Sequence, residues 1–391
     1  MLVAHKWFLC KLCSSVSTGR LNLRQWLQSW VRTKASRLSL PVRMSGWMSL
    51  SDLWWLPTWD QLPRKDLKNQ TVGCNTIQVL YKSQPLLLDA EGNADANIEF
   101  TFGPATNVEY SCSITWNNRM LVYGGWGNYQ YQISEVSDCS LTVIGELPFT
   151  HLYGACTVAN EQIYLCFSQF PTETAGKLCY QTDDPLGGFS ALPQIEGLRG
   201  VLISYFSNSY WDPYIQSNYK HLHTRVAASS VDLLAMGGET KPKAEMFNFS
   251  SKRWREIDRF PFGGAVETLA PLIFTDGFYY TFGGYRGEDY NFMPTDSSII
   301  ARLDVDGSRW EKVGELVGPR YGHGAIWDGS SFFIVGGKSS RDIWGGKVMT
   351  EVCKWSSNSI VCEEIKPELQ SFYSYPEIFI VDRFYCNGNQ K

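Results

Sequence analysis

The stretch PRYGHGAIWDGSSFFIVGGKSS, residues 319–340, decides how this chain folds. Two short apolar runs flank Asp328-Gly329, a dipeptide that is typical of tight hairpin turns. The second run ends on Gly336-Gly337, where a strand can bend out of its ladder with no side chain in the way. The stretch therefore predicts a β-hairpin that ends in a bend.

The same pattern recurs along the chain. Glycine pairs close four of the copies, at Gly124-Gly125, Gly237-Gly238, Gly283-Gly284 and Gly336-Gly337. Two partial copies lie at 145–167, where Cys166-Phe167 replace the glycines, and at 375–388. Two more strand-like runs follow the glycine pair, and the last of them holds a tryptophan in two copies, Trp254 and Trp310. Four short strands in a period of roughly 50 residues are typical of a β-propeller blade.

The glycine pairs, Trp254, Trp310 and the spacing of Arg320 and His323 resemble kelch repeats over about residues 75–391. We therefore expect an all-β fold, a six-bladed kelch-type β-propeller of four-stranded blades. The sixth copy has two strands, at 375–386, and lacks two, whereas 75–84 and 97–103 are unused. We expect the N-terminal part of the domain to complete the last blade, because an open ring would expose strand edges.

Charge separates the start of the chain from the rest. Residues 1–51 carry eight Lys or Arg and no Asp or Glu, which leaves 27 basic and 39 acidic residues for 52–391. We interpret residues 1–70 as a basic leader or unstructured segment that need not belong to the mature protein. The propeller occupies 71–391. Its net charge of −12 argues against nucleic acid as a partner, and no apolar run is long enough for membrane insertion.

The eleven cysteines favour disulfides. Cys353 and Cys362 flank a short hairpin and are expected to bridge, and a second bridge between Cys74 and Cys386 would join the two ends of the domain. The pairing of the others stays open. Sequons at Asn69 and Asn248 are compatible with glycosylation. Together these features favour an extracellular or secretory location, with the cytoplasm as the alternative.

No catalytic motif is found, so we expect neither an enzyme nor a cofactor. His221 and His223 are the best metal candidates, because kelch-type copper oxidases use Tyr and His ligands. Polar loop residues beside aromatic ones are the simpler interpretation of this pair, and we expect no metal site. For His323 we expect a hydrogen bond within its own blade.

Binding is expected on the propeller face that carries the loops between the second and third strands and between successive blades. Three long loops, 204–225, 285–296 and 338–346, fall in these classes and are rich in the aromatic and Arg residues that dominate interfaces. The candidate residues are Tyr210, Trp211, Tyr214, Tyr219, Tyr285, Arg286, Tyr290, Phe292, Arg341 and Trp344.

The function expected is a non-catalytic protein-interaction domain, as the kelch resemblance implies. The alternatives are an intracellular kelch adaptor, as a ubiquitin-ligase or cytoskeletal scaffold, and a copper oxidase or other propeller enzyme. The partner and the oligomeric state stay open.

Overall fold

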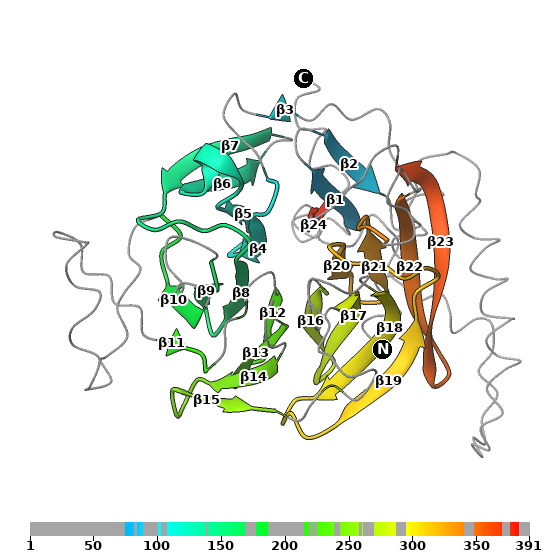
Figure 1. Ribbon diagram of the computed structural model, residues 1–391. Helices are drawn as coiled ribbons and strands as arrows, with labels where there is room; N and C mark the ends of the chain where they lie inside the picture. The colour runs from blue at the N-terminus through cyan, green and yellow to red at the C-terminus, as the bar shows by residue number, and fades with distance from the viewer. Residues whose placement is uncertain are drawn as a thin grey trace, which may run out of the picture. The chain divides into compact units, whose positions relative to one another are not determined.

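A computed structural model gives the structure of this protein (Figure 1). It describes residues 75–81, 84–88, 101–102, 108–137, 140–168, 177–186, 215–218, 221, 225–237, 243–257, 260, 270–286, 295–339, 348–369 and 376–382. The chain divides into two compact units, Met1–Cys74 and Asn75–Lys391. The first lies outside the described residues, and with it our predictions for 1–70, Asn69 and Cys74.

The described part of the second unit is built of β-strands and their connections, with one 3-10 turn, η3 (Gly127–Tyr129). The strands fall into six antiparallel groups, which we number in chain order. Group 1 is β4 (Cys112–Trp116), β5 (Arg119–Tyr123), β6 (Gln132–Ser137) and β7 (Ser140–Glu146). Group 2 is β8 (Ala155–Ala159), β9 (Gln162–Cys166), β10 (Leu178–Thr182) and β11 (Ile215–Gln216). Group 3 is β12 (Arg225–Ala228), β13 (Asp232–Gly237), β14 (Lys243–Asn248) and β15 (Arg253–Glu256).

Groups 4 and 5 have the same strand order. Group 4 is β16 (Leu272–Thr275), β17 (Phe278–Arg286), β18 (Thr295–Asp304) and β19 (Trp310–Glu315). Group 5 is β20 (Gly324–Trp327), β21 (Phe332–Val335), β22 (Val348–Ser356) and β23 (Ser359–Leu369). A short parallel pairing of β19 with β23 joins the two into one eight-stranded sheet. Group 6 is β24 (Glu377–Asp382), β1 (Asn75–Tyr81) and β2 (Gln84–Leu88).

Each group follows from local sequence. The second strand is an unbroken apolar run, such as FFIV in β21, because its two faces are both buried. Asn117-Asn118, between β4 and β5, both take positive φ, as a two-residue hairpin turn requires. Outer strands are polar, as in β15, RWRE, where three of four side chains are exposed. Burial therefore decreases from the first two strands of a group to its last.

The first strands of the groups contact one another in a cycle. β4 contacts β8, β8 contacts β12, and the series continues through β16 and β20 to β24, which contacts β4 again. Figure 1 shows these six strands innermost. Each of the six buried apolar clusters found among the described residues joins two neighbouring groups. The core therefore lies between the groups, and no group buries its faces alone.

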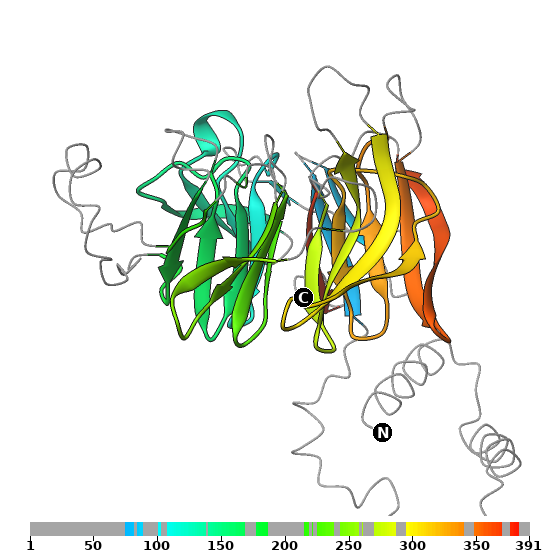
Figure 2. The ribbon, with the colours of Figure 1, turned by 60° about the horizontal axis from the view of Figure 1, so that its bottom comes forward.

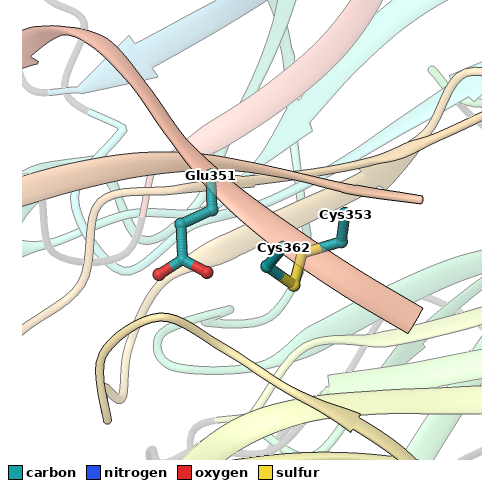
Figure 3. Close-up of side chains that lie close together, drawn as sticks. All are labelled: Glu351, Cys353 and Cys362. Atoms are coloured by element: carbon teal, nitrogen blue, oxygen red, sulfur yellow. A yellow bond between two sulfur atoms is a disulfide. The ribbon is translucent and has the colours of Figure 1, made fainter. Parts of the chain in front are cut away.

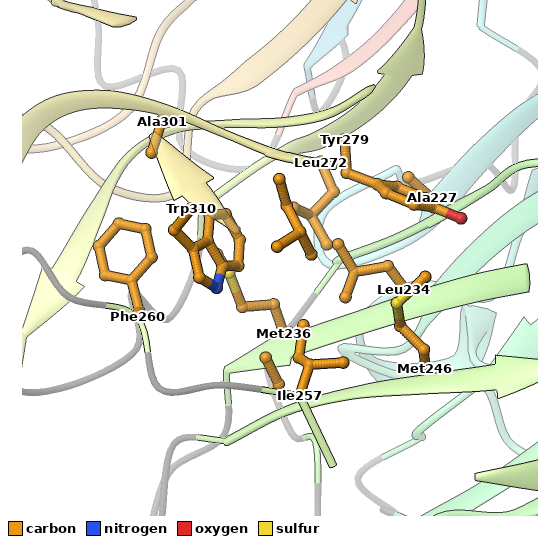
Figure 4. Close-up of a cluster of buried hydrophobic side chains, with 12 residues drawn as sticks. Ala227, Leu234, Met236, Met246, Ile257, Phe260, Leu272, Tyr279, Ala301 and Trp310 are labelled. Atoms are coloured by element: carbon orange, nitrogen blue, oxygen red, sulfur yellow. The ribbon is translucent and has the colours of Figure 1, made fainter. Parts of the chain in front are cut away.

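The predicted tryptophans belong to these junctions. Trp310, from β19, packs between groups 3 and 4 with its ring centroid 5.0 Å from that of Phe260, as Figure 4 shows. Trp254, from β15, is partly buried against the cluster of groups 2 and 3, where its ring centroid lies 6.0 Å from that of Phe167. Both residues are therefore part of the framework.

Group 6 combines the two ends of the domain. β1 pairs with β24 over a register that runs from Asn75 opposite Asp382 to Leu80 opposite Glu377. Completion of the last group by the N-terminal part is therefore seen, but the strand count differs from our expectation. Within the described residues β24 alone comes from 375–386, and β1 and β2 form a hairpin that supplies two strands from 75–88. Of residues 97–103 the structure describes Thr101 and Phe102, which form β3 and pair with β7 at the edge of group 1 instead of joining group 6.

No helix among the described residues has the length and apolar character that a bilayer span requires.

Candidate binding face at the glycine turns

One end of the groups gathers the glycine turns and the starts of the first strands. Cys112 lies opposite Tyr123, Arg225 opposite Met236 and Gly324 opposite Val335, so that each first strand begins where its second strand ends. The connections to the third strand and to the next group leave from the same end, the upper side in Figure 2. We call this the loop end. It is the end on which the sequence predicts binding.

In group 5 a buried ion pair holds the glycine turn. Arg320 donates from Nη1 to the carbonyl oxygen of Gly336 at 3.1 Å, and its Nη2 donates to the carboxylate of Glu351. That carboxylate also accepts from the backbone N–H of Val317 at 2.9 Å. Burial lowers the pKa of Arg320, and the charge of Glu351 opposes the shift. We call this arrangement the Arg–Glu lock, because it ties the incoming connection to the glycine turn and to β22.

Group 3 holds its turn in the same way with a histidine. His221 is fully buried, and its Nδ1 lies 2.9 Å from the carbonyl oxygen of Gly237 while Nε2 lies 2.9 Å from Oε2 of Glu245. We call this arrangement the His–Glu lock. In each lock the basic residue lies 16 positions before the glycine whose carbonyl it contacts. In each lock the carboxylate residue pairs across the ladder with the residue two positions before that glycine. Both ring nitrogens of His221 therefore face oxygen atoms at hydrogen-bonding distance. His223 lies outside the described residues.

Group 2 has a histidine at the same repeat position, but the residues around it differ. His151 lies 16 residues before Phe167, which takes the left-handed conformation of the missing glycine at φ 64°. The carboxylate is replaced by Tyr180, which stacks on Phe149 with ring centroids 3.8 Å apart. His151 instead approaches a sulfur, with Nε2 3.2 Å from Sγ of Cys112. Burial, with a smaller contribution from the charge of Arg225, lowers the pKa of His151 to about 3.

His323, three residues after Arg320, is a correction to the sequence analysis. Its side chain is buried, and neither ring nitrogen makes a hydrogen bond of good geometry with the described residues. The expected hydrogen bond within the group is therefore not found. Burial, and then the charge of Arg320, hold the pKa of His323 well below its usual value.

A polar cluster lies where three first strands begin. Arg225 of β12 places Nη2 3.7 Å from Oε1 of Glu377 in β24, and its Nη1 donates to the carbonyl oxygen of Ser111 at 3.4 Å. Ser111, just before β4, donates from Oγ to Glu377 Oε1 at 3.2 Å. Burial raises the pKa of Glu377 although Arg225 and the serines oppose the shift. Sequence reasoning missed this cluster, because the sixth copy lacks a glycine pair on which Glu377 could be aligned with Arg225.

Aromatic side chains form a second cluster at the junction of groups 1 and 2. The rings of Tyr110 and Tyr153 lie 4.1 Å apart, and Trp126 meets them edge-on at 5.6 and 6.2 Å. Trp126, directly after a glycine pair, is 49% exposed. Tyr110 and Tyr153 hold positive φ of 61° and 55°, which is unusual for bulky residues. We call these three residues the aromatic cluster.

Most of the predicted binding residues lie outside the described part of the chain. Tyr285 follows its glycine pair in β17, as Trp126 does in group 1, and its ring lies 5.3 Å from that of Tyr321. Arg286 is the last residue of β17. The others that fall outside are Tyr210, Trp211, Tyr214, Tyr219, Tyr290, Phe292, Arg341 and Trp344, and the same holds for Gly238.

Three disulfides occur among the described residues. Cys353–Cys362 joins β22 to β23 where the hairpin spacing predicts it. The other two are Cys112–Cys156 and Cys166–Cys179. The predicted Cys74–Cys386 bridge and Cys139 lie outside the described residues.

Glu351, Cys353 and Cys362 place potential metal-ligand atoms close together, as Figure 3 shows. The two sulfurs are bonded to each other, and Glu351 is held in the Arg–Glu lock. The oxidised site therefore offers no thiolate to a metal.

Comparison with known proteins adds information about the fold. No family model matches this sequence, and no curated protein matches it either. A solved structure titled "Structure of YjhT" aligns with 74% of this chain and 97% of its own, with a TM-score of 0.52 and 13% sequence identity. At that identity the likeness bears on the fold alone.

Proposed function

We propose that the six groups are the blades of a six-bladed kelch-type β-propeller whose loop end binds a protein partner, without catalysis of its own. The cyclic contacts of the first strands and the pairing of β1 with β24 support the ring. The sixteen-residue spacing shared by both locks supports a true repeat.

The aromatic cluster is the observation that carries the binding proposal. An exposed tryptophan braced by two tyrosines offers a rigid apolar surface, and such side chains lose little conformational freedom on binding. Backbone strain of the kind seen at Tyr110 and Tyr153 costs about 1–3 kcal/mol and concentrates at functional sites. A structure that needed only to cover the junction could do so without it.

An extracellular or secretory location fits the three disulfides, since bridges persist in oxidising compartments. Asn248 is a suitable glycan acceptor at the end of β14. Its Nδ2 donates to Asp232 at 2.9 Å, and an attached glycan would leave one N–H for that bond. Enzymatic removal of N-linked glycans from the secreted protein should lower its mass, and the Asn248→Gln variant should remove the shift that belongs to this sequon.

Site-specific photo-crosslinking tests the binding proposal. The full chain, secreted from eukaryotic cells, would carry a photoreactive phenylalanine analogue at position 126 or, as the control, at Val231, which is also 49% exposed and lies in the hairpin turn at the opposite end of group 3. We expect one extracellular protein to be captured from position 126 and not from position 231. Equal capture from both positions would reject a partner site at the loop end.

A second candidate function rests on the polar cluster. A nearly buried carboxyl group with a raised pKa beside an arginine is typical of acid–base sites. Catalysis there would involve Glu377 as the proton carrier and Arg225 as the anchor of an anionic group. A turnover screen of small organic acids with the secreted protein would test it, and a hit whose pH profile is abolished by Glu377→Gln would favour this function over the first.

A further inference from the structure

The Cys112–Cys156 bridge differs from the other two in what it joins. It connects β4 of group 1 to β8 of group 2, whereas Cys166–Cys179 and Cys353–Cys362 each tie neighbouring strands of one sheet. Breaking either intra-sheet bridge leaves the strands joined by their backbone ladder. Breaking Cys112–Cys156 removes the cross-link between the two groups, and β4 and β8 are then held by side-chain packing and a few hydrogen bonds, such as that from Trp116 Nε1 to the carbonyl oxygen of Glu161 at 3.2 Å.

The two sulfurs of this bridge have unequal surroundings. Cys112 is 1% exposed and its Sγ lies 3.2 Å from Nε2 of His151, whereas Cys156 is partly exposed. An incoming thiolate reaches the exposed sulfur more easily, and the better leaving group is the sulfur whose negative charge is stabilised. An imidazole N–H beside Cys112 supplies that stabilisation in the Nε2-protonated tautomer.

We propose that Cys112–Cys156 is a thiol-exchange site, at which a low-molecular-weight thiol attacks Cys156 and Cys112 leaves as a thiolate held by His151. The new bond forms between the incoming sulfur and Cys156 Sγ, and the Cys112–Cys156 bond breaks with its electron pair staying on Cys112 Sγ. One disulfide replaces another, so no further oxidant or reductant is needed. The incoming thiol gives up its proton to solvent before it attacks, and the Cys112 thiolate takes one up from solvent afterwards, so the products are a mixed disulfide on Cys156 and a free thiol at Cys112.

Cys353–Cys362 provides an internal comparison. It too pairs a fully buried cysteine with a partly exposed one, so the access of a thiol to the two bridges is similar. Its neighbour is the carboxylate of Glu351 instead of an imidazole. A carboxylate next to a departing thiolate opposes the development of negative charge. Of the two bridges, exchange should therefore favour Cys112–Cys156.

The position of the bridge links it to the aromatic cluster. Tyr110 lies two residues before Cys112, Tyr153 lies three before Cys156, and the N–H of Tyr153 donates to the carbonyl oxygen of Tyr110 at 3.1 Å. Trp126 is tied to the same segment through the carbonyl oxygen of Glu109 at 2.9 Å. Opening the bridge should therefore loosen the strained tyrosines and change the surface that Trp126 presents.

The first experiment needs no variant. The native full chain would be incubated with reduced glutathione, quenched with iodoacetamide at intervals and mapped by peptide mass spectrometry. We expect glutathione on Cys156 and alkylation on Cys112, at a rate about 10-fold above that of Cys353–Cys362. Glutathione on Cys112, or equal opening of the two bridges, would overturn the proposal.

A variant then tests the role of the imidazole. His151→Leu removes the N–H that stabilises the departing thiolate, and we expect it to slow opening of Cys112–Cys156 about 10-fold while the rate at Cys353–Cys362 stays unchanged; His151→Gln, which keeps an N–H donor, should retain more of the rate. An unchanged rate at both bridges would remove His151 from the mechanism. Fluorescence tests the link to the aromatic cluster. Subtracting the spectrum of Trp126→Phe from that of the wild type gives the signal of Trp126, which should change when the Cys112–Cys156 bridge opens, whether or not a protein partner binds at the loop end. A signal that stays constant would reject the link.

Discussion

Groups 5 and 2 use one position of the repeat for opposite purposes. In group 5 that position holds Arg320, which is neutralised by Glu351 and fastens a glycine turn. In group 2 it holds His151, with a tyrosine where the carboxylate would be and Phe167 in place of the glycine. With a tyrosine in place of the carboxylate, the ring of His151 instead lies beside Cys112 of the neighbouring group. The same position of the repeat therefore faces a carboxylate in one group and a disulfide sulfur in another.

The largest effect expected from this comparison is on the Arg–Glu lock. Glu351→Ala leaves the guanidinium of Arg320 buried without its counter-charge, which should cost about 3–5 kcal/mol of the free energy of unfolding. In group 3, Glu245→Ala should cost less, about 1–3 kcal/mol, because a histidine can lose its proton and an arginine cannot. Denaturant unfolding of both variants measures the two losses of unfolding free energy. Equal losses would show that the charge of the basic residue does not determine how much the lock contributes to stability.

A glycine substitution tests how closely the main chain of His151 packs against the glycine turn of group 1. Gly124 and Gly277 both have positive φ, at 73° and 81°, so alanine meets a similar backbone penalty of about 1 kcal/mol at each. A Cβ at Gly124 would fall 1.7 Å from the carbonyl oxygen of His151, whereas nothing lies within 4 Å at Gly277. Gly124→Ala should therefore lower the free energy of unfolding by about 2–4 kcal/mol and Gly277→Ala by about 1. Similar thermal midpoints for the two variants would contradict this assignment.

The free energy of unfolding should depend on pH through His151 but not through Arg320, its counterpart in group 5. The pKa of His151 is about 3 in the folded state and 6.5 ordinarily, so below pH 6.5 the unfolded chain binds a proton that the folded chain excludes. Its contribution to stability is complete above pH 6.5 and is lost as the pH falls towards 3, by about 1.4 kcal/mol per pH unit. His151→Gln should flatten the slope of unfolding free energy against pH in that window, with the disulfides kept oxidised. A parallel slope in the variant would contradict the shift.

The smallest stability effect should come from the exposed side of the same junction. Trp126 is half exposed and meets two tyrosines edge-on, so Trp126→Ala should lower the free energy of unfolding by about 1 kcal/mol or less while weakening binding of a partner at the loop end. A loss of several kcal/mol would show instead that the tryptophan belongs to the framework, as Trp310 does.

The framework could be predicted from the sequence because it depends on local patterns. Apolar runs, turn dipeptides and the glycine pairs indicate where strands begin and bend, and the Cys353–Cys362 bridge follows from a hairpin. Completion of group 6 by the N-terminal part could be inferred from the unused strand-like runs, but the individual strands could not be placed, because Pro85 hides β2.

The polar and aromatic clusters could not be predicted in the same way. Arg225, Glu377 and Ser111 come from three groups and meet only when the first strands are brought together. The positive φ of Tyr110 and Tyr153 is forced by the junction and is not a preference of tyrosine. The sequence analysis predicted binding by long aromatic loops instead, because loop length and composition can be read from the sequence without knowledge of the fold.

The pairing of β1 with β24 also bears on synthesis of the chain. β1 is made early, but its partner follows about 300 residues later, so β1 must wait on the ribosome for a time set by translation. During that interval groups 1 to 5 can form in order, each against the one before, while the edge of β1 that later pairs with β24 stays open; its other edge is already covered by β2. The nascent chain therefore carries an exposed adhesive edge until residue 382 emerges, and this edge is where a chaperone would be needed most.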